Sequence, residues 1–537
     1  MTARWKLRVA APELAARYRA EGLWTDESMG AVLAAGMAGS MDAPALFRSD
    51  VRPFMGTVAD LAAMSARVAG ALAADGVGPG DVVAFQAPNW VEAAATFIGA
   101  ALTGASVIPI VHFYGRKEVA YVLADAQPTV VVCSHSFRGV EHAATMAGLR
   151  PELPDVRRWV VIGGDAPGFT PFEEWIDGVE PRAEPVAVDP DEVALIAYTS
   201  GTTSDPKGVI HTHRTILSEI RQLGQLRATG DRPLLTGAPV GHGIGLLGGL
   251  LIPVARGDGV HYIDVWEPGA VLQAMIADDV AAGSGSTFFL LSLLDHPTFG
   301  PEHASHMTRI GLGGSTVPPA ISERAGTLGI SVVRSYGSTE HPSVTGGHHD
   351  DPLDKRIHTD GRPLPGVEMR IVDPDDTGAG EIWSRGPELF VGYTDADLTA
   401  TAFDADGWYA SGDVGRVDDD GYLTITDRKK DIIIRGGENV SAVEVEDVLI
   451  RIPGVAEVAV VAAPDERLGE HGCAFVRLLP GTDPDTVDLA SVRSHMEAAG
   501  LARQKWPEEV RAVTDFPRTP SGKIQKFVLR DQLRSER

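Results

Sequence analysis

Amphipathic stretches and short apolar runs alternate through the first two hundred residues of the chain. Apolar positions with helical spacing occur at residues 61–76, 89–105 and 119–127. Between and after these stretches lie almost wholly apolar runs with the length of a buried strand, at residues 81–88, 106–111, 129–134 and 157–163. This alternation predicts an α/β domain with a largely parallel sheet.

A different pattern begins near residue 366. Residues 366–375, 380–393 and 415–427 alternate apolar and polar positions between Asp- and Gly-rich turns, which predicts a β-rich, antiparallel part. Beyond the charged segment 426–431 the pattern becomes mixed, and a small α+β unit is expected. A chain of 537 residues also exceeds what one hydrophobic core usually supports. We therefore predict two domains, residues 1–429 and 430–537.

Small and hydroxyl residues crowd around Lys207 in the segment 198–213, YTSGTTSDPKGVIHTH. The apolar run before it predicts a buried strand, and residues 209–223 predict a helix after it. Backbone N–H groups and hydroxyls in such a loop can surround phosphate oxygens, and the lysine adds a positive charge. A Walker-type loop needs other residues where Pro206 and Gly208 stand, so this loop is of another kind. The residues alone favour a nucleotide-phosphate loop, and a surface turn stays open as the alternative.

Four further segments offer groups that could act on a nucleotide. They are SYGSTEHPS (335–343) with Glu340, GWYASGDVGRV (407–417) with Asp413, DRKKDIIIRGGEN (427–439) with Arg428, and FPRTPSGKIQK (516–526) with Lys523. Taken singly, each has an ordinary structural explanation as a strand-end turn, an Asx-turn, a solvated linker or a surface lysine.

Taken together and in this order, the five segments resemble the motifs of the adenylate-forming superfamily of acyl-CoA synthetases, aryl-CoA ligases, adenylation domains and luciferases. The resemblance extends over most of the chain. It is close at residues 198–208, 336–340, 407–416, 427–440 and 517–526. Residues 241–254 and 264–275 are most similar to the stand-alone fatty, cyclic and aryl acid CoA ligases.

The resemblance implies a large, multi-subdomain N-terminal α/β domain with a β-rich part, and a small mobile C-terminal α+β domain. It also implies ATP, Mg²⁺ and coenzyme A, and two half-reactions. A carboxylate first attacks the α-phosphate of ATP to give acyl-AMP and pyrophosphate, and the thiol of coenzyme A then displaces AMP. Two anions meet in the first step, so positive charge and hydrogen-bond donors are needed there.

The resemblance also assigns roles to individual residues. The implied catalytic residues are Lys523, Glu340, Thr339 and Lys207, the implied Mg²⁺ ligands are Glu340 and Thr202, and Lys430 is the implied hinge. The residues implied to bind ATP or coenzyme A are Thr199, Ser200, Gly201, Thr202, Thr203, Ser204, Lys207, Gly314, Ser315, Arg334, Ser335, Tyr336, Gly337, Thr339, Asp413, Arg428, Gly436, Gly437 and Glu438. Of these, Tyr336, Gly314, Ser315, Arg334 and Ser335 are implied for the adenine site, Asp413 and Arg428 for the ribose, and residues 436–438 for the channel by which the thiol approaches. The residues implied to form the acyl pocket are His242, Gly243, Phe289, Gly313 and His341.

Two positions depart from the family pattern. Ser204 stands where glycine is usual, which we expect to have at most a modest effect because the position is at the loop tip. His341 stands where smaller residues are common, and we expect it to narrow the acyl pocket or to place a polar group near its mouth. Glycine, serine, phenylalanine and leucine dominate residues 283–297 and predict a medium-length, branched or cyclic acid.

Two alternatives remain open from the sequence. An acyl-AMP ligase would pass the acyl group to an acyl carrier protein instead of to free coenzyme A. A non-catalytic relative would bind the nucleotide or the acyl ligand without turnover, although the presence of Lys523 and Glu340 disfavours it.

Charge and composition narrow the partners. The formal net charge of −26 repels polyanions, so neither nucleic acid nor an anionic membrane surface is an expected partner. The longest apolar stretch, residues 243–255, is too short and too rich in glycine to predict a membrane span. Two distant cysteines, Cys133 and Cys473, and an N-terminal segment without an apolar signal region favour a cytoplasmic location.

Overall fold

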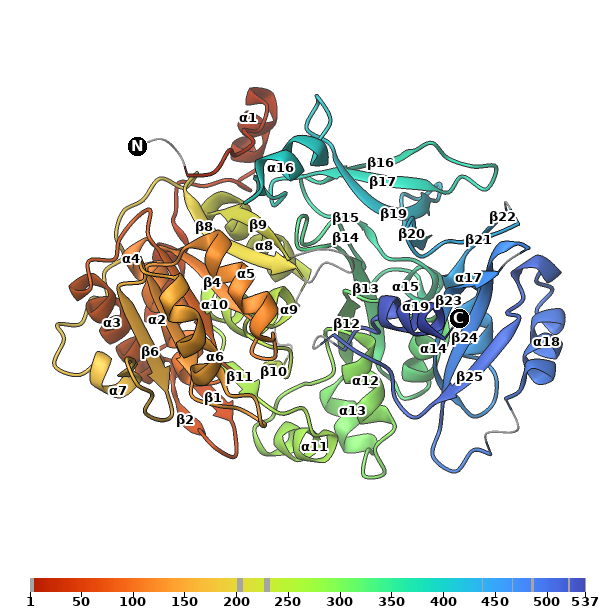
Figure 1. Ribbon diagram of the computed structural model, residues 1–537, viewed down its shortest axis with the longest axis horizontal. Helices are drawn as coiled ribbons and strands as arrows, with labels where there is room; N and C mark the ends of the chain where they lie inside the picture. The colour runs from red at the N-terminus through yellow and green to blue at the C-terminus, as the bar shows by residue number, and fades with distance from the viewer. Residues whose placement is uncertain are drawn as a thin grey trace.

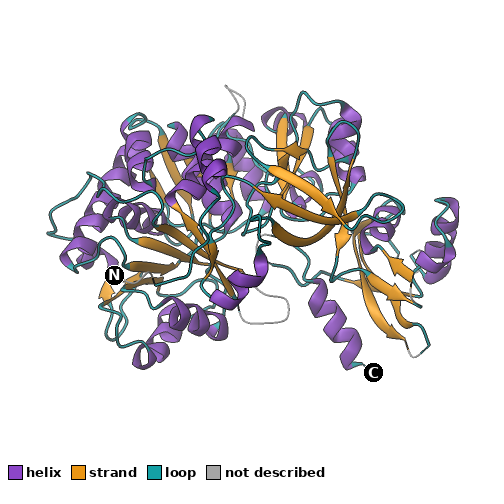
Figure 2. Ribbon diagram, turned by 90° about the horizontal axis from the view of Figure 1, so that it is seen from above, coloured by secondary structure: helices purple, strands orange, loops and turns teal. Residues whose placement is uncertain are grey.

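The computed structural model describes residues 4–199, 206–226, 232–436, 438–465, 467–483, 487–519 and 522–536. In these residues the chain forms five β-sheets with helices packed around them, as Figure 1 shows. Figure 2 shows the helices on both faces of the sheets in the larger, N-terminal part. The mixed α/β architecture, with a large N-terminal part and a small C-terminal part, confirms the predicted fold class.

An eight-stranded sheet forms the centre of the N-terminal part. Its strand order is β18-β9-β8-β4-β3-β5-β6-β7. The strands are β3 (Val82–Gln86), β4 (Ser106–Ile110), β5 (Val130–Ser134), β6 (Arg158–Ile162), β7 (Thr170–Pro171), β8 (Val193–Thr199), β9 (Lys207–Thr212) and β18 (Gly392–Tyr393). Strands β3 to β8 run parallel, as predicted, because helices α4 (Val91–Thr103), α5 (Arg116–Ala126) and α6 (His142–Leu149) return the chain between them.

The segment after the phosphate loop begins as a strand. β9 pairs antiparallel with β8, and helix α8 (His213–Leu226) starts only at His213. The prediction of a helix from residue 209 onwards is therefore wrong at its start. Val209 and Ile210 are β-branched and fully buried, so pairing with β8 prevails over the helical spacing.

A second sheet and the first helices complete the N-terminal core. The sheet has the order β10-β11-β1-β2, formed by β10 (Leu235–Thr236), β11 (Val260–Ile263), β1 (Pro44–Arg48) and β2 (Phe54–Thr57). Helices α2 (Met29–Ala38) and α3 (Val58–Ala74) pack against α4, and α1 (Pro12–Ala20) precedes them. A capping box of Thr57 and Asp60 begins α3. Buried residues of α2, α3, α4, β1 and β11 belong to one continuous apolar cluster, whereas Leu14 and Tyr18 of α1 form a separate cluster with Leu23.

Two smaller sheets follow. In the first, β12 (Arg309–Gly313) and β13 (Ser331–Tyr336) run parallel, and β14 (Thr345–Gly346) and β15 (Arg362–Pro363) continue it antiparallel. The second is wholly antiparallel, as predicted, with β16 (Glu368–Val372), β17 (Gly380–Arg385), β19 (Tyr409–Val417) and β20 (Leu423–Arg428).

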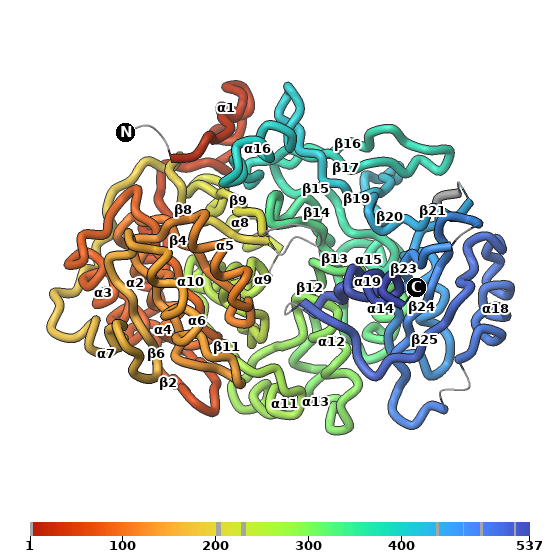
Figure 3. The backbone as a smooth tube through the Cα atoms, viewed as in Figure 1, coloured from red at the N-terminus to blue at the C-terminus, as the bar shows by residue number. Residues whose placement is uncertain are grey.

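The C-terminal part is built on its own sheet. The strands are β21 (Ile433–Arg435), β22 (Glu438–Val440), β23 (Val455–Asp465), β24 (Gly469–Leu478) and β25 (Glu509–Val513), and the helices are α17 (Ala442–Leu449), α18 (Leu489–Ala498) and α19 (Lys526–Ser535). The predicted boundary at residue 430 lies in the connection between β20 and β21, and the division there remains a prediction. Figure 3 shows this part, in blue, beside α14 (Pro319–Thr327) in green, where Arg451 pairs with Glu323 at 3.1 Å.

Short helical segments connect these elements. They are α7 (Phe172–Trp175), α9 (Gly243–Gly245), α10 (Ile252–Arg256), α11 (Pro268–Ala277), α12 (Thr287–Leu294), α13 (Pro301–His306), α15 (Leu353–His358) and α16 (Ala396–Ala402), with 3₁₀ turns at Arg150–Glu152 and Arg503–Lys505 and a π-helical segment at Leu246–Leu251. The described part of the chain contains no helix with the length and apolar character that a bilayer-spanning segment requires.

Candidate active site

A cavity of about 1750 Å³ is lined by residues from both parts of the chain. Its wall includes the ends of β8 and β9, one face of α8, the carboxyl ends of β12 and β13, and residues of β19 and β20. Lys523, Gln525 and their neighbours add a contribution from the C-terminal part. Segments that lie far apart in the sequence therefore meet at one site.

The phosphate-loop lysine lies at the first residue of β9. Lys207 pairs in register with Thr199, the last residue of β8, and both line the cavity. The Lys207 ammonium lies 5.4 Å from the ring centroid of Tyr393, within the range of a cation–π contact. The tip of this hairpin, with the predicted phosphate ligands Ser200, Gly201, Thr202, Thr203 and Ser204, lies outside the described residues.

Glu340 belongs to the loop between β13 and β14 and lines the cavity. Its Oε1 accepts a hydrogen bond from the Tyr393 hydroxyl at 2.8 Å, and its carbonyl accepts one from the Phe390 amide at 2.8 Å. The neighbouring Thr339 carbonyl lies 2.8 Å from the His211 Nε2. A Cβ at Gly337 would lie 1.8 Å from the Pro342 carbonyl oxygen, so the loop can fold back only with glycine there. The hydrogen bonds from Tyr393 and Phe390, together with the turn at Gly337, therefore fix the position of the Glu340 carboxylate.

The predicted ribose-binding pair lies across two adjacent strands. Asp413 on β19 and Arg428 on β20 are register partners, and their Oδ1 and Nε atoms lie 2.8 Å apart. The Tyr336 hydroxyl donates to Asp413 Oδ2 at 2.8 Å, and burial raises the pKa of this phenol well above its usual value. Asp413 and Arg428 line the cavity, whereas the buried Tyr336 lies behind its wall.

Lys523 reaches the same cavity from the C-terminal part. Burial, followed by the positive charge of Arg428, lowers its pKa to about 7, and Asp413 opposes this change. Gly522 lies so close to α12 that a Cβ there would be 2.6 Å from the Phe288 Cβ. The close contact between Gly522 and α12 keeps Lys523 in the cavity, and a larger residue at position 522 would therefore displace it.

His242 precedes α9, and it lines the cavity together with Gly243. Its Nδ1 accepts a hydrogen bond from the Ile244 amide at 3.3 Å. Burial, followed by the charge of Lys523, lowers the pKa of His242 to about 4, so the imidazole is neutral at neutral pH. The structure thus brings the predicted acyl-pocket histidine and the C-terminal lysine into one electrostatic neighbourhood.

Residues predicted for the adenine site are divided. Gly314, Arg334 and Ser335 line the cavity, whereas Ser315 does not. Gly337, predicted to bind ATP or coenzyme A, and Gly313, predicted for the acyl pocket, also line it. The Arg334 guanidinium also donates to the Ile357 carbonyl and pairs with Asp360. Contacts with residues outside the cavity lining therefore fix the position of the Arg334 side chain.

The residues predicted for the hinge and for the thiol channel differ in whether they reach the cavity. Lys430 lines the cavity, and burial lowers its pKa. Gly436 donates its amide to the Leu468 carbonyl at 2.7 Å, with a left-handed φ of 59°. Gly436 is not part of the cavity wall, Gly437 is not among the described residues, and of Glu438 only the backbone, in β22, is described.

Two of the residues predicted for the acyl pocket, His341 and Phe289, are not among the residues that line the cavity. His341 is 1% exposed, and its ring nitrogens lie 2.7 Å from the Ser384 hydroxyl and 2.7 Å from Glu388 Oε1. The His341 ring lies outside the cavity lining, where Ser384 and Glu388 hold it, and it therefore does not narrow the cavity. Its contacts support the loop between β13 and β14. Phe289 packs against Trp266, with ring centroids 4.7 Å apart, and lies outside the lining residues.

The sequence reading missed three wall residues. His211 and Tyr393 contact the loop that contains Thr339 and Glu340, and Glu219 lines the cavity from α8. A signal was present in each case: a histidine within an apolar strand, a tyrosine in a glycine-flanked strand, and a carboxylate within an apolar helical face. None of these signals shows which distant residues His211, Tyr393 and Glu219 meet in the folded chain.

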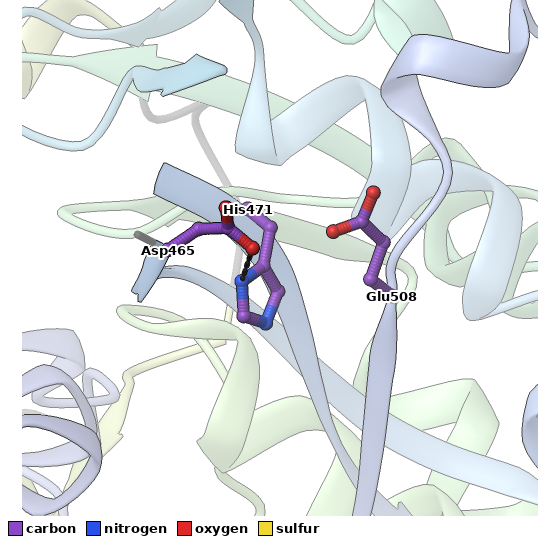
Figure 4. A group of neighbouring side chains, drawn as sticks. All are labelled: Asp465, His471 and Glu508. Carbon is purple, nitrogen blue, oxygen red and sulfur yellow. Dashed lines mark ion pairs between the residues drawn. The ribbon is translucent and has the colours of Figure 1, made fainter. Parts of the chain in front are cut away.

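A group of three potential metal ligands lies in the C-terminal part. Figure 4 shows Asp465 and His471 close together and Glu508 facing them from the neighbouring strand region. His471 Nδ1 lies 3.6 Å from Asp465, but Glu508 is paired with the Arg435 guanidinium. None of the three lines the cavity, so this group does not supply the Mg²⁺ ligands that phosphates need.

The cavity is positive in a strongly negative protein. Its lining cations among the described residues are Lys117, Lys207, Arg232, Arg309, Arg334, Arg428, Lys429, Lys430, Arg518 and Lys523. With a net charge of −26 on the whole chain, an anionic ligand depends on such local charge. The arrangement can bind phosphates and stabilise negative charge that develops between two anions.

Two protein families match the chain. The AMP-binding enzyme family matches residues 33–394, and the AMP-binding enzyme C-terminal domain matches residues 444–523. The chain is 34% identical over 527 residues to the medium-chain fatty-acid–CoA ligase of Escherichia coli K12, covering 96% of this chain and 92% of that protein. It is 37% identical over 485 residues to the 3-[(3aS,4S,7aS)-7a-methyl-1,5-dioxo-octahydro-1H-inden-4-yl]propanoyl:CoA ligase of Rhodococcus jostii RHA1, covering 86% and 91%.

Solved structures show the same architecture. ATP-bound MatB from Rhodopseudomonas palustris superimposes with a TM-score of 0.82 at 29% identity, over 94% of this chain and 99% of that one. An anthranilate CoA ligase in complex with anthranoyl-AMP superimposes equally well, with a TM-score of 0.82 at 24% identity, which bears on the fold alone.

Proposed function

Because this chain belongs to the AMP-binding enzyme family of adenylate-forming ligases, we propose that it joins a medium-length, branched or cyclic carboxylic acid to coenzyme A with ATP. The chain is an acid–thiol ligase that uses ATP and coenzyme A. The class of acid, the acceptor beyond coenzyme A and the roles of single residues are the proposal.

In the first half-reaction a carboxylate oxygen attacks the α-phosphorus of ATP. The new P–O bond gives acyl-AMP, and the bond to the β-phosphate oxygen breaks to release pyrophosphate. Lys523 would bridge the carboxylate and α-phosphate oxygens, Lys207 would neutralise the leaving phosphates, and Asp413 with Arg428 would hold the ribose. The buried position of Lys523 supports this role, because a charge in a site of low dielectric acts strongly on a nearby anion.

The residues present fit a Mg²⁺ ion on the phosphates. Glu340 lines the cavity, offers the hard carboxylate oxygens that Mg²⁺ prefers, and is positioned by Tyr393. Bound there, the ion would neutralise charge on the phosphates. Thr202, the second proposed ligand, is outside the described part of the chain.

In the second half-reaction the coenzyme A thiol attacks the acyl carbon of the adenylate, and AMP leaves. Lys523 occupies the cavity while Gly436 lies off its wall, so a thiol channel at residues 436–438 would require the C-terminal part to turn. We assign the hinge to Lys430, which lies between β20 and β21. Hinge motions of this kind depend on a few residues at element ends.

The apolar part of the cavity wall supports the proposed class of acid. Ile216, Leu223, Leu246, Leu247 and Ile252 line the cavity and offer a surface for an aliphatic or alicyclic group. The named substrates of two relatives, a medium-chain fatty acid and a bicyclic propanoate, belong to this range. His242 would lie at the entrance of this pocket, consistent with its place beside Lys523.

The observation that supports the proposal most directly is the meeting of Lys523 with the Asp413–Arg428 pair at one cavity. The test is a carboxylate panel with ATP and Mg²⁺, following pyrophosphate release and the mass of the acyl product. Medium-length and cyclic acids should give acyl-CoA with free coenzyme A. Pyrophosphate release that yields thioester only with a carrier protein would assign the acceptor to the carrier, and no release with any acid would overturn the proposal.

A further inference from the structure

One face of α8 forms part of the cavity wall. The residues on this face are Ile216, Glu219, Leu223 and Leu226, at a spacing that places them along one side of a helix. Three of the four are apolar. Glu219 is a carboxyl group in the middle of an apolar stripe, where burial without partners is costly.

Glu219 is only half satisfied by the protein. It is fully buried, and its Oε1 accepts a hydrogen bond from the Ser343 hydroxyl at 2.6 Å. Its Oε2 has no hydrogen-bond partner among the residues that the structure describes. Buried polar atoms are almost always paired. Because Glu219 belongs to the residues that line the cavity, a ligand group that the carboxyl group turns to meet is the partner that this oxygen lacks.

The surroundings keep this carboxyl protonated. Burial, followed by the negative charge of Glu388, raises the pKa of Glu219 to about 8, and the Ser343 hydroxyl opposes the shift only partly. At neutral pH the group is therefore an O–H donor as well as an acceptor. A neutral donor suits an uncharged oxygen and gives no support to a second carboxylate on the acid.

We propose that Glu219 is a specificity-determining residue that donates a hydrogen bond to a keto or hydroxyl oxygen on the acyl part of the substrate. The inference rests on the proposed ligase function and narrows its substrate class to oxygen-substituted aliphatic or alicyclic acids. Relative to a plain hydrocarbon acid, such a substrate pairs the otherwise unpaired Glu219 oxygen.

Ser343 links this polar spot to the reacting end of the cavity. It lies three residues after Glu340 in the loop between β13 and β14. The Cα atoms of these two residues can be at most about 11 Å apart. The substituent that meets Glu219 must therefore lie at a limited distance from the activated carboxylate, so its position along the acid matters.

The test compares octanoate with oxooctanoates that bear the ketone at each successive carbon. For the wild-type enzyme we expect one or two neighbouring positions to be preferred over octanoate by about tenfold or more in kcat/KM, measured by pyrophosphate release. Glu219→Leu should reduce this preference to within about twofold of unity while octanoate is still turned over. Glu219→Gln, which retains a neutral N–H donor, should keep most of the preference.

Gln222→Leu is the matched control. Gln222 is also buried and polar on α8, but it bonds to Pro365 and Glu388 and does not line the cavity, so the preference should not change. An equal response of Glu219→Leu and Gln222→Leu, or a wild-type enzyme without any keto preference, would overturn the inference. Calorimetric binding of the same acids separates the two proposals. Preferential binding of a keto acid without turnover contradicts the ligase function alone, and turnover without preference contradicts the role of Glu219 alone.

Discussion

The carboxyl groups at the two ends of the cavity differ in how completely protein partners satisfy them. At the nucleotide end, the carboxylates that line the wall have close protein partners: Glu340 has Tyr393, and Asp413 has both Arg428 and Tyr336. At the acyl end, the wall is largely apolar, and Glu219 keeps one oxygen without a described partner. The first end is organised before any ligand binds, whereas the second leaves one hydrogen bond for the ligand to complete.

This difference shows how one cavity can carry out the same reaction on every acid and still select among acids. Pre-positioned charges act on the phosphates and the carboxylate, which every substrate of the reaction has in common. A single unpaired donor acts only on what distinguishes one acid from another. Changes at the nucleotide end should therefore reduce the rate for all acids, and changes at the acyl end should reorder the acids.

The largest expected effect is at Lys523. Lys523→Ala should reduce adenylation by about 10²–10³-fold, or about 3–4 kcal/mol, because a buried positive charge is removed from the developing anion. The same variant should convert a supplied acyl-adenylate to thioester at a rate within a few-fold of the wild type. Pyrophosphate release and single-turnover thioester formation measure the two steps separately.

Two further variants control this experiment. Lys505→Ala removes a lysine of the C-terminal part that pairs with Glu444 and lies off the cavity wall, so both steps should be retained. Lys430→Pro stiffens the proposed hinge and should slow thioester formation more than adenylation. If Lys523→Ala and Lys430→Pro lose both steps equally while folded, the two orientations do not exist.

The next largest effect is expected at Glu340. Glu340→Gln should lower adenylation by about two orders of magnitude for every acid and raise the Mg²⁺ concentration needed for half-maximal rate, since an amide is a poorer ligand than a carboxylate. Tyr393→Phe keeps the carboxylate and removes only its hydrogen bond, so a loss of about tenfold or less is expected. Mg²⁺ titrations of both variants check this, and an unchanged Mg²⁺ response in Glu340→Gln would remove the residue from the metal site.

A smaller effect is expected from pH. Because the pKa of Lys523 is lowered to about 7, its charge is present below pH 7 and is lost as the pH rises through that value. Adenylation kcat/KM should fall by up to about tenfold per pH unit above the break. Bound phosphates favour the charged lysine, so the break in kcat should lie at higher pH. Lys523→Arg should show no such break, and its persistence in that variant would assign the titration to another group.

The remaining effect is on stability instead of rate, and it concerns Glu219 at the acyl end. The pKa of Glu219 is raised from 4.5 to about 8 on folding, beside Glu388, which His341 contacts. The folded state holds this proton between pH 4.5 and about 8, so stability should fall with rising pH across that window by at most about 1.4 kcal/mol per unit. Glu219→Gln cannot titrate and should lose less stability. Melting temperatures of both proteins from pH 5 to 8 measure the difference, and parallel curves would contradict it.

Some elements were predictable because local pattern determines them. Runs such as Val82–Gln86 and Val130–Ser134 are apolar at every position but the last, and only a strand buried on both faces accepts such a run at this length. The segment after Lys207 was not predictable in this way. Residues 209–223 fit a helical spacing, and only pairing with β8 makes the first four of them a strand.

The candidate site shows the same division. Motif resemblance identified Lys207, Glu340, Asp413, Arg428 and Lys523, and the structure brings all five to one cavity. Of the residues predicted for the acyl pocket, His341 and Phe289 do not line the cavity. His341 lies between the wall residues Glu340 and Pro342 but contacts Ser384 and Glu388, and Phe289 packs against Trp266. Adjacent residues on an extended loop or a helix point in different directions, so sequence proximity does not decide which of them meets a ligand.

The sequence by itself determined the two kinds of sheet, the order of the chemical motifs and the need for local positive charge in an acidic protein. These properties follow from hydrophobic periodicity, turn residues and net charge, which short segments contain in full. Only the tertiary structure decided that Glu219 lines the cavity beside Ser343 with an unpaired oxygen. The protonation and the partners of a buried group depend on the dielectric and on neighbours more than a hundred residues away, and no local segment contains them.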